Sequence, residues 1–237
     1  MRKNPTISVV VPAYNEEKYI GECLLALKNQ TYPKDRYEVI VVDNNSTDNT
    51  AAIAKEFGVR IVGCQVQGVA AARVAGSEAC DKDIIAQTDA DSAPRADWLE
   101  KIANHFTKDH NLIGCTGAAY LRGVNPIFSK ASFSIFNTFQ RFNFLISKPT
   151  FSGFNFAVRR QSYKEVGGID PNIVSAEDVD LSFRLKKAGK IEFFSDCVVY
   201  TSARRITNNP YKFFKHHVRN YFAMISGKSP EPFENIR

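Results

Sequence analysis

The chain has 237 residues, of which 44% are hydrophobic, enough for one large α/β domain or at most two small ones with a sizeable core. No stretch approaches the roughly 18 to 20 apolar residues of a spanning helix, and the first residues lack the apolar region of a signal peptide, so we expect a cytosolic protein. The five cysteines are scattered and form no C-x-x-C pair. This spacing argues against a disulfide framework or a zinc site and favours small core residues.

The net charge of +6 is unevenly distributed along the chain. Residues 110–164 carry seven Lys and Arg and no acidic residue, and residues 201–237 carry seven against two acidic residues. Basic surfaces of this kind attract anions, a class that includes nucleic acid, anionic lipid headgroups and phosphorylated small molecules. Charge alone does not separate these three partners.

Strands and helices are predicted to alternate through the first half of the chain. The expected strands cover residues 7–14, 37–43, 59–63 and 83–89, and the expected helices cover 15–30, 45–58, 68–80 and 94–106. Asn15 is a candidate cap for the first helix, whose apolar residues recur at helical spacing. Four strand–helix units in a row predict a Rossmann-like, mostly parallel sheet flanked by helices.

Polar residues follow three of these strands, as "PAYNE", "DNNSTD" and "DAD". Each cluster alone is explained by helix capping and turn chemistry. In open α/β sheets, however, ligands bind beyond the carboxyl ends of the strands, so three clusters on one rim favour a binding site. In an extended chain, Asp89 and Asp91 would project to the same face and could hold one hard cation; the alternative is an ordinary turn.

Several nucleotide-binding motifs are missing from this rim. A dinucleotide site needs G-x-G-x-x-G after the first strand, where the chain reads "PAYNEE". The one "GKS" has Phe222 in place of the first P-loop glycine. A nucleotidylyltransferase would need a glycine-rich basic loop at the same place, so that class is disfavoured.

The second half of the chain holds less regular signals. "SAEDVDLSFRLKKAG" predicts an amphipathic helix in which Ser175 and Asp178 resemble a capping box. "FSKASFSIFNTFQRFNFLISK", residues 128–148, is aromatic, basic and free of acids, like an interfacial helix, and residues 211–228 repeat this character. Packing on the same domain is the alternative for both segments. The adjacent His216 and His217 are expected to be solvated.

Taken in order, "VVVPAYNEE", "VVDNNSTDNT", "GVAAARVAG", "DADSAPRADWL", "SGFNFAVRR", "GGID" and "AEDVDLSFRL" closely resemble the family 2 glycosyltransferases with a GT-A fold. The resemblance covers about residues 6–205. It implies an α/β GT-A domain over 1–205, with a nucleotide-binding half (1–109) and a smaller acceptor-binding half (110–205), followed by a basic aromatic helical tail (206–237). It also implies an inverting enzyme, and a non-processive one, because no Q-x-x-R-W motif follows the helix of Asp178.

The resemblance assigns roles to individual positions. Asp178 would be the general base, and Asp91 with Asp89 would hold Mn²⁺ or Mg²⁺, Asp89 lying nearer the ribose. Many family members add a late histidine ligand, where this chain has Thr201 and Ser202. The nucleotide sugar would contact Pro12, Ala13, Tyr14, Glu16, Asp43, Asn45, Gly68, Arg73, Asp89, Ala90 and Asp91. The acceptor or the transferred sugar would contact Gly153, Asn155 and Glu177. The diphosphate would contact Arg204 and Arg205.

For Gly153, a glycine-relieved bend in a core strand is an equally good explanation. The expected partners are a UDP- or GDP-linked sugar donor and a glycan or lipid-linked acceptor, with peripheral contact at the cytosolic membrane face and no nucleic acid. The alternative is a catalytically silent module that binds sugar nucleotides; the intact Asp89, Asp91 and Asp178 argue against it.

Overall fold

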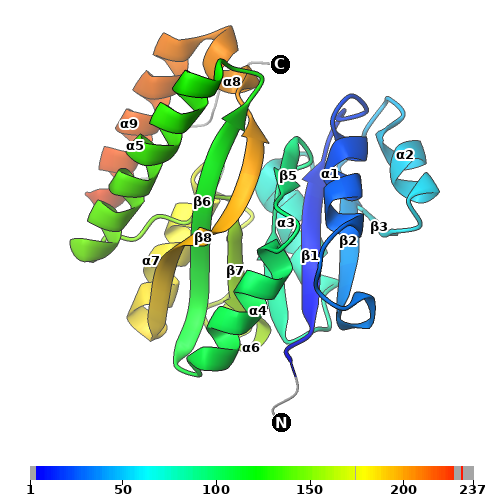
Figure 1. Ribbon diagram of the computed structural model, residues 1–237, viewed down its shortest axis with the longest axis horizontal. Helices are drawn as coiled ribbons and strands as arrows, with labels where there is room; N and C mark the ends of the chain where they lie inside the picture. Colours follow the sequence, from blue (N-terminus) through cyan, green and yellow to red (C-terminus); the bar gives the residue numbers. More distant parts are fainter. Residues whose placement is uncertain (1–3, 174, 227–230, 232–237) are drawn as a thin grey trace.

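The computed structural model describes residues 4–173, 175–226 and 231, and these form a mixed α/β fold (Figure 1). Eight strands in this part of the chain form one curled sheet in the order β3-β2-β1-β4-β7-β6-β8-β5. The strands are β1 Ile7–Ala13, β2 Tyr37–Asp43, β3 Arg60–Gly63, β4 Ile84–Gln87, β5 Ser92–Pro94, β6 Leu112–Arg122, β7 Phe156–Arg159 and β8 Lys190–Ser202. The helices are α1 Ile20–Lys28, α2 Thr50–Glu56, α3 Val69–Glu78, α4 Trp98–Lys108, α5 Pro126–Leu145, α6 Arg160–Glu165, α7 Glu177–Ala188, α8 Arg204–Asn208 and α9 Pro210–Ile225.

The predicted mostly parallel sheet is confirmed. β1 pairs in parallel with β2 and β4, β2 with β3, and β6 with β8. The antiparallel pairs are β4–β7, β6–β7 and β5–β8, and each includes at least one strand, β5, β6, β7 or β8, that the alternating first-half pattern does not cover.

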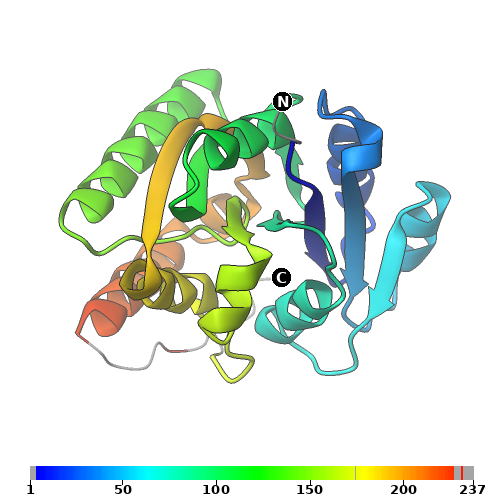
Figure 2. The ribbon, with the colours of Figure 1, turned by 90° about the horizontal axis from the view of Figure 1, so that it is seen from below.

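Each face of the sheet is covered by a separate hydrophobic core. Val9 and Val11 of β1 belong to the core shared with α1, α2 and α4, whereas Val10 between them belongs to the core shared with α3 and α7. Figure 2 shows the sheet between these two helix layers. A strand that is apolar on both faces is what a central parallel strand requires. The five cysteines are buried and free, as predicted.

Three predicted helix starts are wrong. Asn15 does not cap α1, which begins at Ile20; Asn15 has φ of 53° and its side chain accepts a hydrogen bond from Thr47 N instead. Pro94 lies in β5, and α4 begins only at Trp98. Ser175 does not cap α7, because the residue before the helix is Ala176, in the left-handed conformation. In each case the helix starts later than predicted, since Asn15 binds the loop after β2, Pro94 pairs with β8 and Ser175 contacts α9.

The predicted tail begins inside α8 and continues as α9, and its residues 227–230 and 232–237 lie outside the described part. α9 contacts α5 through the rings of Tyr221 and Phe139, 5.4 Å apart. Within the described ranges, no helix combines the length and apolar composition needed to cross a bilayer.

Candidate functional site

The turn after β4 connects two distant parts of the sheet. β4 pairs with β1 and β7 in the centre, whereas β5, only five residues later, pairs with β8. Asp89, Ala90 and Asp91 form the turn between them, closed by a hydrogen bond from Ser92 N to Asp89 O. The extended geometry that would place both carboxylates on one face is therefore wrong, and each carboxylate contacts a different arginine.

Arg73 is the centre of the first group of charges. It lies on α3 and is 2% exposed. Its Nη2 donates to Asp89 Oδ1 at 2.6 Å and its Nε to Glu177 Oε1 at 3.2 Å. Its Nη1 donates to Gln87 Oε1 and to the carbonyl of Gly153. One buried guanidinium thus joins the end of β4, the loop before β7 and the start of α7.

The pairing of β7 with β4 explains how the glycine loop reaches this point. Phe156 is opposite Gln87, so residues 150–155 lie at the carboxyl end of β4. A Cβ atom on Gly153 would lie 2.5 Å from Arg73 Nη2 and 3.3 Å from Asp178 Oδ2. A glycine at position 153 is therefore required by the close approach of Arg73 and Asp178, a reason that differs from both explanations offered by the sequence, a sugar or acceptor contact and a bend in a core strand.

Asp178 is held in a half-buried position in the first turn of α7. Its Oδ1 accepts a hydrogen bond from Val179 N at 2.9 Å. Burial raises the pKa of its carboxyl group to about 7; neighbouring Glu177 also raises this pKa, and Arg73 lowers it. A carboxyl group that titrates near neutral pH can accept a proton efficiently in this range.

Asp91 belongs to a second group, centred on Arg204. Arg204 follows β8, and the pairing of Ser92 with Thr201 brings the end of β8 to the turn of Asp91. Arg204 Nη2 lies 2.9 Å from Asp91 Oδ2, and the same guanidinium contacts both carboxylate oxygens of Glu16 at 2.5 and 2.9 Å. The Tyr19 ring lies 4.5 Å from Arg204 Cζ. Of the Asp91 side chain, 7% is exposed.

The predicted nucleotide pocket occupies the neighbouring rim. Ala13, which follows the buried Pro12, pairs in register with Asp43. Asp43 Oδ1 accepts from Ser46 N, and Asn45, with φ of 64°, donates to the carbonyl of Gln65. Glu16 N donates to Thr50 Oγ1, which ties the loop after β1 to the start of α2. The half-buried Tyr14 lies in the first of these loops.

Two buried residues of the rim escaped prediction. Asn44 is 2% exposed, donates to the carbonyls of Cys64 and Val66, and accepts from Gly68 N at 2.8 Å. It thereby fixes the turn at Gly68, which has φ of 139° immediately before α3. Gln87 orients Arg73, as described above. The sequence offered one signal for each of these two residues. Gln87 is a polar residue within an apolar strand, and Asn44 is the first of two consecutive asparagines after a strand.

Asn155 has a structural position. It is 1% exposed; its Nδ2 donates to the carbonyls of Ala118 and Cys197, and its Oδ1 accepts from Trp98 Nε1. Its amide is thus engaged by three protein partners, which gives it a role in joining β6, β8 and α4. The predicted acceptor contact has no support from this arrangement.

The carboxylates of the rim suit a hard divalent cation, since oxygen ligands are what Mg²⁺ and Mn²⁺ prefer. Burial raises the pKa of the Cys23 thiol, and the nearby carboxylates of Asp91 and Asp89 raise it further. Thr201 Oγ1 accepts from Ser92 Oγ. His105, Asp196 and Cys197 form another compact group of potential ligand atoms, away from this rim.

The remaining predicted contacts are placed as follows. Glu177 is 6% exposed and bound to Arg73, and Ala90 is buried between the two aspartates. The backbone of Arg205 lies in α8, and its side chain is outside the described part. His216 is half-buried and only partly solvated: its Nε2 lies 3.3 Å from Ser175 Oγ and 3.0 Å from Asn220 Nδ2. The His217 side chain also lies outside the description.

Comparison with known proteins gives consistent matches. The family described as Glycosyl transferase family 2 matches residues 8–167. Glycosyltransferase AglE of Haloferax volcanii is 31% identical over 202 residues, covering 82% of this chain and 66% of the relative. Probable glycosyltransferase YdaM of Bacillus subtilis is 29% identical over 220 residues, covering 84% and 51%. The chain thus spans about half to two thirds of the length of these relatives.

Solved structures support the fold. Mannosyltransferase PcManGT from Pyrobaculum calidifontis, in complex with GDP-Man and Mn²⁺, superimposes with a TM-score of 0.73 at 22% identity, covering 97% of this chain and 66% of that chain. S. aureus TarS in complex with UDP-GlcNAc gives a TM-score of 0.66 at 20% identity, covering 92% and 66%. The mixed, curled sheet with helices on both faces is accordingly of the GT-A type. The family match covers more than half of the residues, and the chain belongs to the family 2 glycosyltransferases.

Proposed function

We propose that this chain transfers a sugar, with inversion, from a nucleotide diphosphate donor to an acceptor hydroxyl, with Asp178 as the general base. The observation that carries the proposal is the contact of Arg73 with both Asp89 and Glu177, which links the donor side of the rim to the helix of Asp178. Asp178 would accept the hydroxyl proton as the acceptor oxygen attacks the anomeric carbon. A base at this place needs a pKa near the working pH, as Asp178 has.

The donor would lie along the rim from β2 to β4. Asp43, at the end of β2, would hydrogen-bond the base, and Pro12, Ala13 and Tyr14 would form the adjacent wall. Arg73 would act mainly through Asp89 and Glu177, because four of its five N–H donors are bound to protein groups. Asn45 and Gly68 would shape the pocket through their positive φ angles.

Asp91, supported by Asp89, would hold Mn²⁺ or Mg²⁺. When bound, the ion would neutralise charge that develops on the departing diphosphate. PcManGT, with GDP-Man and Mn²⁺ bound, shares this fold and supports the proposal by analogy. Arg204 places a positive charge beside Asp91.

The donor can be identified by thermal unfolding with UDP, GDP, CDP and their sugars, each with and without Mn²⁺. One base is expected to raise the Tm by about 5 to 10 °C at a hundredfold excess over Kd, and only when Mn²⁺ is present. Asp91→Asn should abolish the metal-dependent part. Stabilisation by none of the nucleotides would contradict the proposed function, and stabilisation without sugar transfer would favour a silent binding module.

Arg204 is expected to compete with the metal ion for Asp91. Arg204 bridges Asp91 and Glu16, so Mn²⁺ that binds without nucleotide must displace the guanidinium from Asp91. When a nucleotide is bound as well, its diphosphate gives the guanidinium another anion to pair with. Arg204→Gln should therefore raise the Mn²⁺ affinity of the nucleotide-free protein by about five- to a hundredfold and weaken the effect of nucleotide on Mn²⁺ binding. Electron paramagnetic resonance of free Mn²⁺ measures both.

The matched control for this experiment is Arg95→Gln, since Arg95 forms a similar bidentate pair with Asp97. The control should leave Mn²⁺ affinity unchanged. If Arg204→Gln behaves like the control, the assignment of Arg204 as the competing cation is wrong, while the donor experiment still decides the proposed function.

We also propose that the acceptor is a glycan or lipid-linked molecule presented close to a membrane. The support is the exposed apolar surface of α5, which lies next to the glycine loop: Gln140 Nε2 donates to Ser152 Oγ, one residue before Gly153. A membrane-bound acceptor would then reach the carboxylate of Asp178 from this side.

A further inference from the structure

The fully buried residues of helix α5 are polar and several of its exposed residues are large and apolar, unlike those of an ordinary surface helix. Its buried residues are Gln140 and Asn143, 1% and 0% exposed. By contrast, Ile135 is 71% exposed and Leu145 is 82% exposed. The inner side of α5 also contacts the domain through Phe133, Phe136 and Phe144. Exposing large apolar side chains to water is unfavourable, so we expect the outer side of α5 to bind an apolar partner.

Gln140 and Asn143, the two buried residues of α5, have hydrogen-bond partners within the protein, whereas the buried Oδ1 of Asn137 has none in the described part of the chain. Gln140 Oε1 accepts from Thr150 Oγ1, and Asn143 Nδ2 donates to the same hydroxyl. Asn143 Oδ1 accepts from the Tyr221 hydroxyl of α9. These bonds fix the rotation of the helix about its own axis. The apolar residues therefore face outward in the folded protein itself, and their exposure does not result from fraying of the helix.

Helix α9 extends the exposed apolar surface. Figure 1 shows it beside α5 at the end of the molecule remote from β3. Tyr211, Val218 and Phe222 recur at helical spacing and are exposed. We call the combined surface the α5/α9 face; its exposed apolar members are Ile127, Phe128, Ile135, Phe139, Phe142, Leu145, Ile146, Tyr211, Val218 and Phe222.

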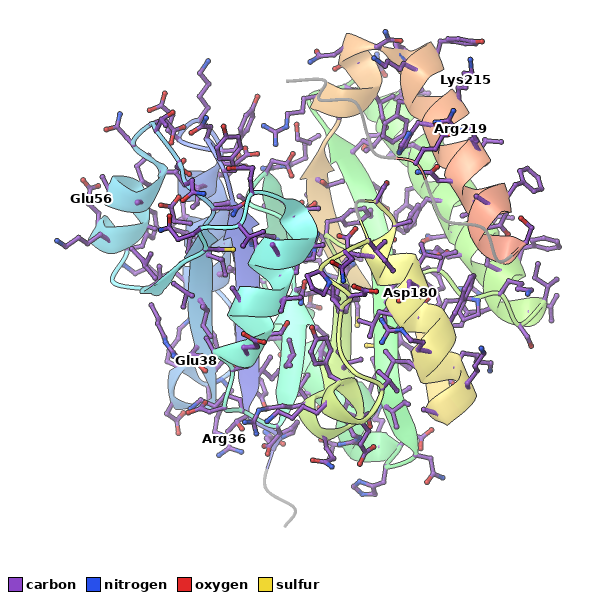
Figure 3. All side chains as sticks on the ribbon, turned by 180° about the vertical axis from the view of Figure 1, so that it is seen from behind. Arg36, Glu38, Glu56, Asp180, Lys215 and Arg219 are labelled. Atoms are coloured by element: carbon purple, nitrogen blue, oxygen red, sulfur yellow. The ribbon has the colours of Figure 1, made fainter. Side chains whose placement is uncertain are left out.

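The charge around this face selects the partner. Residues 110–164 contain no acidic residue, and neither do residues 201–226. Lys130 on α5 and Lys215 on α9 are exposed, and Figure 3 marks Lys215 and Arg219 along α9. Arg219 is paired with Glu231, so Lys130 and Lys215 add the basic charge at this surface. Apolar side chains with more cations than anions around them match the boundary between anionic headgroups and acyl chains. A protein partner would match equally well only if it were acidic and apolar.

We propose that the α5/α9 face docks the protein onto the surface of an anionic lipid bilayer, with the helices lying in the interface. The inference deepens the proposed function, on which its link to a membrane-bound acceptor rests. α9 also contacts the segment before α7, through Asn220 Nδ2 and Ser175 Oγ at 3.3 Å. Docking would therefore take place directly beside the segment that carries Asp178.

Vesicle co-sedimentation tests the proposal. The protein should bind vesicles of equal parts phosphatidylcholine and phosphatidylglycerol, bind phosphatidylcholine vesicles weakly, and be released by high salt. The double variant Ile135→Ser/Leu145→Ser should lower the partition coefficient by at least about tenfold, because each side chain loses its transfer free energy into the acyl region. Leu25→Ser on α1, where Leu25 is 49% exposed, is the matched control and should bind as the wild type does.

The outcomes separate this inference from the proposed function. Equal binding by the double variant and the wild type, or no binding to either vesicle, would overturn the docking surface. A concentration-dependent dimer that the double variant abolishes would assign the face to a second copy instead, which also overturns it. Thermal stabilisation by nucleotide and Mn²⁺ should be the same in the wild type and the double variant. Failure of the donor experiment would therefore contradict the proposed function whatever the result of the vesicle experiment.

Discussion

Replacing Asp178 by asparagine is expected to lower the rate of sugar transfer by about two to four orders of magnitude while leaving nucleotide binding unchanged. Asparagine keeps the size of the side chain, and its carbonyl oxygen can still accept the hydrogen bond from Val179 N. It cannot accept the hydroxyl proton of the acceptor. Transfer is measured as release of the nucleoside diphosphate with the donor that thermal unfolding identifies.

The pH dependence of transfer follows from the same residue. Burial raises the pKa of the Asp178 carboxyl group to about 7, so the group is largely protonated below that pH and cannot act as a base. The rate is therefore expected to rise with pH through about 7 and then level off. For folding the sign is opposite: because the folded state binds this proton more tightly than the unfolded state, the contribution of Asp178 to stability falls as pH rises from about 4 to 7.

Asp180→Asn is the matched control for this experiment. Asp180 lies in the same turn of α7, but its carboxylate is paired with Arg184, four residues later (Figure 3). The variant should keep its transfer rate and the shape of its pH profile. Near-normal transfer by Asp178→Asn would contradict the role of Asp178 as the base.

The first half of the fold was predictable because its contacts are mostly local. Each parallel unit places a strand, a polar loop and a helix in sequence, and periodicity reports all three. The positions of Asp43 and Asp89 at strand ends followed directly from this pattern. Arg73 was placed by the family resemblance, whereas its contact with Glu177 joins elements more than a hundred residues apart.

The contacts that the sequence could not predict depend on the antiparallel pairs β5–β8 and β4–β7. Pairing of β5 with β8 brings Arg204 to Asp91, and pairing of β7 with β4 brings Gly153 to Arg73. Asn155 has a motif position typical of ligand contact, yet the same pairings bury it between β6 and β8. Periodicity of α5 correctly predicted an apolar stripe, but its outward direction is set by the partners of Gln140 and Asn143.

Arg73→Met is expected to lower the free energy of unfolding by about 3 to 5 kcal/mol at neutral pH. The substitution removes a cation that is 3% exposed and leaves the carboxylates of Asp89 and Glu177 without their ion pair. Burial itself disfavours the charged guanidinium, but Asp89, Glu177 and Asp178 together hold the pKa of Arg73 above its ordinary value. Urea unfolding measured at several pH values tests the expectation, because protonation of the carboxylates should reduce the loss at low pH.

The same variant shows whether Arg73 only stabilises the fold or also sets the pKa of the general base, Asp178. Arg73 lowers the pKa of Asp178, so its removal should move the midpoint of the pH–rate profile upward. Arg184→Met is the matched control: its pair with Asp180 is about a quarter exposed, so the variant should cost less than about 1 kcal/mol and leave the midpoint in place. A stable Arg73→Met protein with an unshifted midpoint would mean that the three carboxylates do not depend on this guanidinium. The donor and acceptor sides of the rim would then have to be coupled through some other contact.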